Sequence, residues 1–199
     1  MKNLKFRGIA LPYCIFSFLI LVLSSCTAKD EVRRTIEGMT GKPVVIDDKG
    51  LIVWKPKSSY QMTKRSPRPY TLLVYVDSAQ CSECFVKGLA EWNQMLRLEN
   101  DKRYDVQFVF IMEALKGKGN LLQRHLDESD FKHEVLIDEK ACFRKANSQI
   151  PQDNIYHTFL LDRDYKIILV GNPLHNENIK KLFLKLLNGT KNGKIYKSD

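Results

Sequence analysis

Two cysteines three positions apart, Cys81 and Cys84, are the residues of this chain whose type and spacing most clearly indicate a chemistry. They belong to a Cys-Ser-Glu-Cys run that follows an apolar stretch over residues 70–76 and opens a helical pattern. Residues three apart on a helix lie on the same face. Two cysteines placed in this way after a strand can form and open a disulfide with little backbone movement. The spacing therefore predicts thiol–disulfide chemistry.

The two cysteines are expected to have different roles. Cys81 would lie near the helix N-terminus, where unpaired backbone N–H groups and the helix dipole favour a thiolate, so it is the expected nucleophile. Cys84 lies one turn further along and is expected to resolve the mixed disulfide. Ser82 and Glu83 stand between them, and the carboxylate of Glu83 disfavours a second negative charge beside it. Lys87, four residues after Glu83, is expected to offset that charge in part. We therefore predict a mild couple of the reducing type.

The first 26 residues have the layout of an export signal. A basic start is followed by an apolar core over residues 9–23 and then by Leu-Ser-Ser-Cys, which ends at Cys26. The apolar run is short and contains Pro12, so it predicts a cleaved signal peptide over residues 1–25 and no spanning helix. The four residues that end at Cys26 resemble a lipobox, the site at which bacterial lipoproteins are cut and acylated. The alternative is an ordinary signal peptide or an anchor, in which Cys26 is incidental.

An acylated Cys26 would anchor the protein to a membrane without spanning it. We therefore expect a cell-envelope location facing the periplasm or the cell surface, where a disulfide can persist. Loss of residues 1–25 would lower the formal net charge from +9 to +6, because it removes Lys2, Lys5 and Arg7 and no acid. This excess is modest and no nucleic-acid-binding motif accompanies it, so a nucleic-acid partner is not expected.

Composition divides the remaining chain into three parts. Residues 26–42 are polar and lack an apolar period, and they are expected to form the acylated N-terminus and a tether. Residues 43–189 are long enough for one domain with a core. Residues 190–199 form a polar tail.

Apolar patterns within the domain predict alternating strands and helices. Residues 44–46 and 51–54 flank a turn and predict a hairpin. Helical spacing after Cys84 recurs at Phe85, Leu89, Trp92 and Leu96. The other expected strands span residues 70–76, 106–112, 134–137, 157–161 and 166–170, and the other expected helices span residues 121–126, 141–147 and 179–187. This order predicts a sheet with parallel strands that is covered on both faces, with antiparallel pairing in the last hairpin.

At this point the chain resembles the thioredoxin-like superfamily, in particular its membrane-anchored, extracytoplasmic thiol–disulfide oxidoreductases. Three segments over roughly residues 43–188 carry the likeness: residues 72–84, residues 135–138, and residues 158–162 with the strand that follows. The resemblance implies an α/β fold, a three-layer sandwich with a mixed central sheet and helices on both faces. It also implies that Cys81 attacks and Cys84 resolves. Such exchange needs no bound cofactor; the partners would be protein thiol or disulfide clients and a membrane electron donor.

The chain departs from the family pattern around the expected site. Gln80 stands where thioredoxins have a tryptophan, Tyr75 stands where they have a buried acid, and Tyr156 stands where they have a cis-proline. Tyr156 and His157 are therefore expected to border the site. His157 would relay a proton to Cys81 or join the thiolates as a metal ligand, or it is simply a hydrogen-bonded histidine at a strand end, which we favour. We assign no metal site.

Three other functions remain open at this stage. The domain can be an envelope binding module in which the disulfide only stiffens a loop, or a metal-binding protein. A peroxidase of the peroxiredoxin kind needs Ser or Thr three residues before its cysteine and Pro four residues before that; Ser78 fits and Val74 does not. Cys142 is expected to be a small buried hydrophobic residue, with a resolving role as the alternative.

Overall fold

The computed structural model describes residues 28–57, 68–79 and 82–189, so Cys26, Gln80 and Cys81 lie outside the described residues. The chain divides into two compact units, Met1–Gly38 and Met39–Asp199. In the first unit, residues 28–38 are helical, where the sequence predicted only a polar tether. An exposed pair four residues apart, Arg33 and Glu37, supports this helix with a contact of 2.8 Å between Nε and Oε1.

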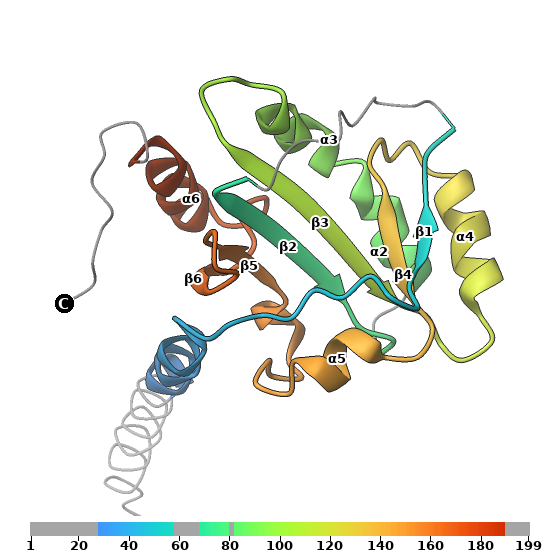
Figure 1. Cartoon of the computed structure of the whole chain (residues 1–199), viewed down its shortest axis with the longest axis horizontal. Coiled ribbons are helices and arrows are strands. Elements are labelled where there is room, and N and C mark those ends of the chain that lie inside the picture. Colours follow the sequence, from blue (N-terminus) through green and yellow to red (C-terminus); the bar gives the residue numbers. More distant parts are fainter. Residues whose placement is uncertain (1–27, 58–67, 80–81, 190–199) are drawn as a thin grey trace, which may run out of the picture. The chain divides into compact units, whose positions relative to one another are not determined.

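The second unit contains the sheet and the helices that surround it (Figure 1). Its elements, in chain order, are β1 (Ile52–Trp54), β2 (Tyr70–Val76), α2 (Ser82–Leu89), α3 (Trp92–Met95), the 3₁₀ helix η1 (Leu96–Glu99), β3 (Val106–Glu113), α4 (Gly119–Asp127), β4 (Val135–Asp138), α5 (Cys142–Ala146), the 3₁₀ helix η2 (Asn154–Tyr156), β5 (Thr158–Leu161), β6 (Ile167–Val170) and α6 (Glu177–Gly189).

In the described part of the chain, six strands form one mixed sheet in the order β1-β4-β3-β2-β5-β6. Strands β2, β3 and β4 are parallel, whereas β1, β5 and β6 pair antiparallel to their neighbours. The central strand β2 pairs with β3 from Tyr70 opposite Val106 to Val76 opposite Met112. A buried parallel strand has apolar residues on both faces, which is why residues 70–76 read as an unbroken apolar run.

Both faces of the sheet are covered. On one face, alternate residues of β2 and β3 join one apolar core with residues of α2, α3, α4 and α6; its members include Leu72, Val74, Phe108, Phe110, Val86, Leu89, Trp92, Leu122, Leu126 and Phe183. On the other face, the ring of Tyr75 on β2 lies 4.8 Å from that of Phe143 on α5. The mixed sheet with helices on both faces confirms the predicted α/β architecture of a central mixed sheet covered on both sides.

The predicted hairpin over residues 44–54 is wrong. Strand β1 pairs with β4, and the preceding segment pairs with the β5–β6 turn through the Val44 N–H and the Tyr165 carbonyl, at 2.8 Å. Asn147 binds the backbone of Val45 in both directions. The turn itself is present, with Gly50 at a φ of 88°, but the two flanking segments diverge to different partners.

Two helical predictions also need correction. The stripe from Phe85 to Leu96 does not lie on one helix, because the chain turns at Ala90 and Glu91 and continues as α3 and η1. Three-residue hydrogen bonds, such as that from the Asn93 N–H to the Ala90 carbonyl, tighten this turn. In α6, the helical spacing of Ile179, Leu182, Phe183, Leu186 and Leu187 predicts one apolar face, but Leu182 is exposed. No described helix combines the length and apolar character that crossing a bilayer requires.

Candidate functional site

The cysteine motif lies where the central strand leads into a helix. Helix α2 begins at Ser82, so Cys81 immediately precedes it in the sequence. Cys84 lies in the first turn of α2 and is exposed. The structure thus brings Cys84 to the position that the sequence predicted, at the start of a helix after a buried strand. Because Cys81 and Gln80 lie outside the described residues, their placement stays a prediction.

The negative charge of Glu83, which stands between the two cysteines in the sequence, is balanced by a lysine on the surface of α2. The Nζ atom of Lys87 lies 2.8 Å from Oε1 of Glu83, and both side chains are exposed. The hydrogen bond and the charge of Lys87, with the charge of His125, hold the pKa of Glu83 below its usual range. The prediction that Lys87 offsets Glu83 is confirmed.

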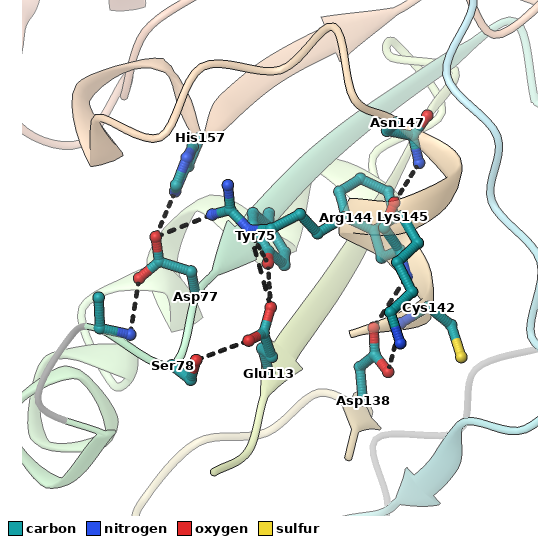
Figure 2. A network of polar contacts seen from close by, with 12 residues as sticks. Tyr75, Asp77, Ser78, Glu113, Asp138, Cys142, Arg144, Lys145, Asn147 and His157 are labelled. Atoms are coloured by element: carbon teal, nitrogen blue, oxygen red, sulfur yellow. Dashed lines mark hydrogen bonds and ion pairs between the residues drawn. The ribbon is translucent and has the colours of Figure 1, made fainter. Parts of the chain in front are cut away.

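A polar network lies at the carboxyl ends of β2 and β3, just before the chain enters the motif (Figure 2). The hydroxyl of Tyr75 donates a hydrogen bond of 2.5 Å to Oε2 of Glu113, and the hydroxyl of Ser78 donates one of 2.6 Å to Oε1. Burial first, and then the bond to Glu113, raise the pKa of Tyr75 far above its usual value. Tyr75 is therefore a neutral donor at every ordinary pH.

Arg144 on α5 also contacts this network. Its terminal nitrogen lies 2.9 Å from Oδ2 of Asp77, and its Nε donates to the Tyr75 hydroxyl at 3.3 Å. The same guanidinium lies 5.5 Å from the centre of the Tyr75 ring and 3.9 Å from Glu113. One guanidinium therefore contacts both of these largely buried carboxylates.

Asp77 also holds the backbone that leads to the motif. Its Oδ1 accepts a hydrogen bond of 3.1 Å from the N–H of Ala79. Ser78, between them, is bound to Glu113. The segment that precedes Gln80 is thus tied to two acids and, through Asp77, to the guanidinium of Arg144.

His157 is buried beside Asp77 and the Tyr75 ring. Its Nε2 lies 2.8 Å from the carbonyl oxygen of Pro151, which can only accept, so Nε2 carries the proton. Its Nδ1 lies 3.9 Å from Oδ2 of Asp77 and makes no hydrogen bond with any residue that the structure describes. Burial, aided by the charge of Arg144, lowers the pKa of His157 despite the opposing effects of Pro151 and Asp77. The imidazole is therefore neutral near pH 7.

A third acid at the same sheet edge fixes α5. Asp138 ends β4, and its two carboxylate oxygens accept hydrogen bonds from the N–H groups of Cys142 and Phe143, at 3.0 and 2.8 Å. These bonds anchor the helix that carries Arg144. Cys142 is half-buried, so the prediction of a buried residue was too strong. Tyr156 is buried in η2, and its neighbour His157 lies directly before β5.

This network was not among the expected features, although the sequence contains a signal for it. Each of the three parallel strands passes from apolar residues directly to an acid, at Asp77, Glu113 and Asp138. The carboxyl ends of parallel strands meet at one edge of a sheet, so three such acids indicate a polar site there. In the described part of the chain, no group of three His, Cys, Asp or Glu side chains is arranged to hold a metal ion.

Comparison with known proteins gives a likeness of fold. No family model matches the chain, and no curated protein matches it. The structure is similar to a candidate thiol:disulfide interchange protein DsbE from Chlorobium tepidum (18% identity, 74% of this chain and 97% of that one, TM-score 0.48). It is also similar to the thioredoxin domain of a thiol-disulfide oxidoreductase from Bacteroides vulgatus (16%, 75% and 98%, TM-score 0.46). A third likeness is to a candidate protein disulfide isomerase from Bacteroides thetaiotaomicron (18%, 75% and 87%, TM-score 0.46). At such identities and scores we draw no conclusion on activity from them.

Proposed function

We propose that this protein is a thiol–disulfide oxidoreductase that acts outside the cytoplasm and is anchored to a membrane through an acylated Cys26. The observation that carries the activity is the exposed Cys84 in the first turn of α2, three residues after Cys81 and directly beyond the central strand. A thiol at this place is reachable by a protein client, and the helix N-terminus favours a thiolate next to it.

The exchange needs only the two thiols and a client disulfide. The Cys81 thiolate attacks one client sulfur, so that a Cys81–client disulfide forms and the other client sulfur leaves as a thiolate. The Cys84 thiolate then attacks Cys81, which closes the Cys81–Cys84 disulfide and releases the second client thiolate. Two electrons pass from the pair to the client. The same steps in reverse oxidise a client.

The charges around the motif favour a mild, reducing couple. In the described part of the chain, two carboxylates, Asp77 and Glu113, share contact with one guanidinium, that of Arg144, and Glu83 is paired with Lys87. A net negative surrounding opposes a strongly depressed thiol pKa, and a strongly depressed pKa is what makes a disulfide a strong oxidant. Equilibration of the pair in a glutathione series measures the potential. A value near about −120 mV, typical of the strongly oxidising periplasmic oxidase, would contradict this proposal.

Client trapping tests the activity. A Cys84→Ser variant should accumulate mixed disulfides with envelope proteins, because the attacking thiol is present and the resolving thiol is absent. Cys81→Ser should trap nothing, and Cys142→Ser should behave as the unmodified protein and serves as the matched control. The unmodified protein should also reduce insulin. No turnover and no trapped client would favour the binding module instead.

Three further measurements separate the remaining alternatives. Peroxide consumption that depends on Cys81 would indicate a peroxidase. Stoichiometric zinc or copper that is lost in Cys81→Ser would indicate a metal-binding protein. Incorporation of labelled palmitate that is abolished in Cys26→Ser supports the lipid anchor, and unchanged incorporation refutes it.

A further inference from the structure

The surface is hollowed between α2 and the end of α4 into a groove of about 400 Å³, which we call the α2–α4 groove. Residues of α2 form one wall, and the end of α4 with the turn that follows forms the other. The side chains that matter here are Glu83, Lys87, His125, Glu128 and Asp130. This volume is enough for one or two side chains of a bound polypeptide.

The groove lies beside the cysteine motif. Glu83, Val86 and Lys87 recur at helical spacing and form the face of α2 that lines it, and Ala90 adds to the lining from the turn that follows. Cys84 follows Glu83 in the chain and is exposed. Adjacent Cα atoms are about 3.8 Å apart, so a polypeptide seated in the groove passes within a few residues of the Cys84 sulfur.

Two of the carboxylates that line the groove have no partner in the described structure. The carboxylates of Glu128 and Asp130 make no hydrogen bond or ion pair with any described residue. Lys87 is already paired with Glu83, at 2.8 Å. Nδ1 of His125 is shielded from solvent and has no hydrogen-bond partner among the described residues. This local sign is opposite to the formal net charge of +9 for the sequence, so the complementary occupant is a cation.

The second wall of the groove is held in place before any partner binds. The amide of Asn93 on α3 donates to the carbonyl of Asp130 at 2.9 Å and accepts from the N–H of Lys132 at 3.1 Å. The hydroxyl of Ser129 closes the end of α4 by donating to the carbonyl of Leu126, at 2.7 Å. A preformed wall lowers the ordering cost of binding.

We propose that the α2–α4 groove binds a lysine or arginine side chain of a polypeptide partner. The identity of this partner rests on the proposed function: it is the client that exchanges disulfides with the motif. The groove then selects clients with a basic residue near the reactive cysteine, whereas Cys81 and Cys84 perform the exchange on any accessible disulfide.

Two synthetic peptides test the selection. Both carry one cysteine as a mixed disulfide with thionitrobenzoate, whose release is followed by absorbance. One has lysines near the cysteine and the other has norleucine at the same positions. Each rate constant with the reduced protein is divided by that with free dithiothreitol, which removes the intrinsic effect of lysine on the peptide. The protein should prefer the lysine peptide by about fivefold to tenfold at low ionic strength.

Variants locate the preference. Glu128→Gln with Asp130→Asn should bring the ratio of the two rates close to one. Lys87→Met should raise the ratio, because it frees Glu83, and any change in thiol pKa cancels in the ratio. Glu91→Gln removes an acid that does not line the groove and should change nothing. A ratio near one in the unmodified protein, or a ratio that survives the double substitution, overturns the proposal.

Failure of the proposed function gives a different result. If neither peptide releases thionitrobenzoate faster than a Cys81→Ser control, exchange is refuted. Binding of the lysine peptide with serine in place of cysteine then decides on the groove. A dissociation constant several-fold weaker for the Glu128→Gln, Asp130→Asn protein supports a groove that binds cationic partners without exchange. Equal dissociation constants overturn it.

Discussion

The contact between Arg144 and Asp77 should contribute strongly to stability because it joins α5 to the end of β2. Asp77 is only 9% exposed in its side chain and lies 2.9 Å from the guanidinium, which is 29% exposed. Removing one partner of a fully buried pair costs about 3–5 kcal/mol. Because water reaches part of the guanidinium, we expect Arg144→Met to lower the free energy of unfolding by about 2–3 kcal/mol. Methionine keeps the apolar stem, so the loss reports mainly on charge and hydrogen bonds.

A double-mutant cycle isolates this contact. Asp77→Asn alone should cost about 1–2 kcal/mol, and the two substitutions together should cost at least about 1 kcal/mol less than the sum of the single costs. Urea unfolding of the reduced protein, followed by the fluorescence of the buried Trp54 and Trp92, gives the four free energies. Arg103→Met, which removes an exposed pair, is the matched control and should change little. Additive costs for Arg144 and Asp77 would refute a direct interaction.

The other predictions concern pH, the motif and one glycine. Burial lowers the pKa of His133, but its pair with Glu99 and its contacts to Glu134 outweigh burial, so the pKa is raised in the folded protein. The stability that His133 contributes is therefore complete below about pH 6.5 and falls as the pH rises through the folded pKa. His157 acts oppositely: its lowered pKa makes stability rise with pH up to about 6.5. Urea titrations from pH 5 to 8.5 should thus show a maximum near about pH 6.5, and His133→Gln should remove the decline above it; a decline that persists refutes the assignment. Glu83→Gln should lower the pKa of the attacking thiol and Lys87→Met should raise it, each by about half a unit, as measured by the pH dependence of iodoacetamide alkylation. Equal profiles in both variants would show that this pair does not tune the thiol. Gly171→Ala should lower the free energy of unfolding by more than about 1 kcal/mol, because φ is 125° and a Cβ would approach Ile179 to 3.1 Å. An unchanged free energy of unfolding would mean that the backbone and the Ile179 side chain accommodate the Cβ without cost.

Elements that are buried on both sides were predictable from the sequence. Strand β2 was predicted with the observed bounds, because the apolar run at residues 70–76 is what a central parallel strand requires. The hairpin prediction for residues 44–46 was wrong because a short apolar run near a turn is equally compatible with a hairpin and with pairing to a distant segment. Its partners, Tyr165 and Asn147, lie far along the chain, and local pattern contains no information about them.

The candidate site likewise contains features that were predictable from the sequence and features that were not. The cysteine spacing and the Glu83–Lys87 pair are local, so the sequence predicted them. Arg144 lies 67 positions from Asp77, and α5 is too short to give a helical period that would orient its side chains. Only the strand order, which brings three acid-ended strands to one edge, places that guanidinium among the carboxylates.

The pairing of β2 has a consequence for how the chain acquires its fold during synthesis. Thr71 is opposite Leu161 on β5, whereas the other neighbour, β3, begins at Val106. A growing polypeptide therefore exposes one edge of its most apolar strand until nearly the entire domain has emerged, and unpaired edges of this kind promote aggregation. We expect nascent chains truncated before β5 to depend on chaperones. This dependence should end when the β5–β6 hairpin has emerged from the ribosome.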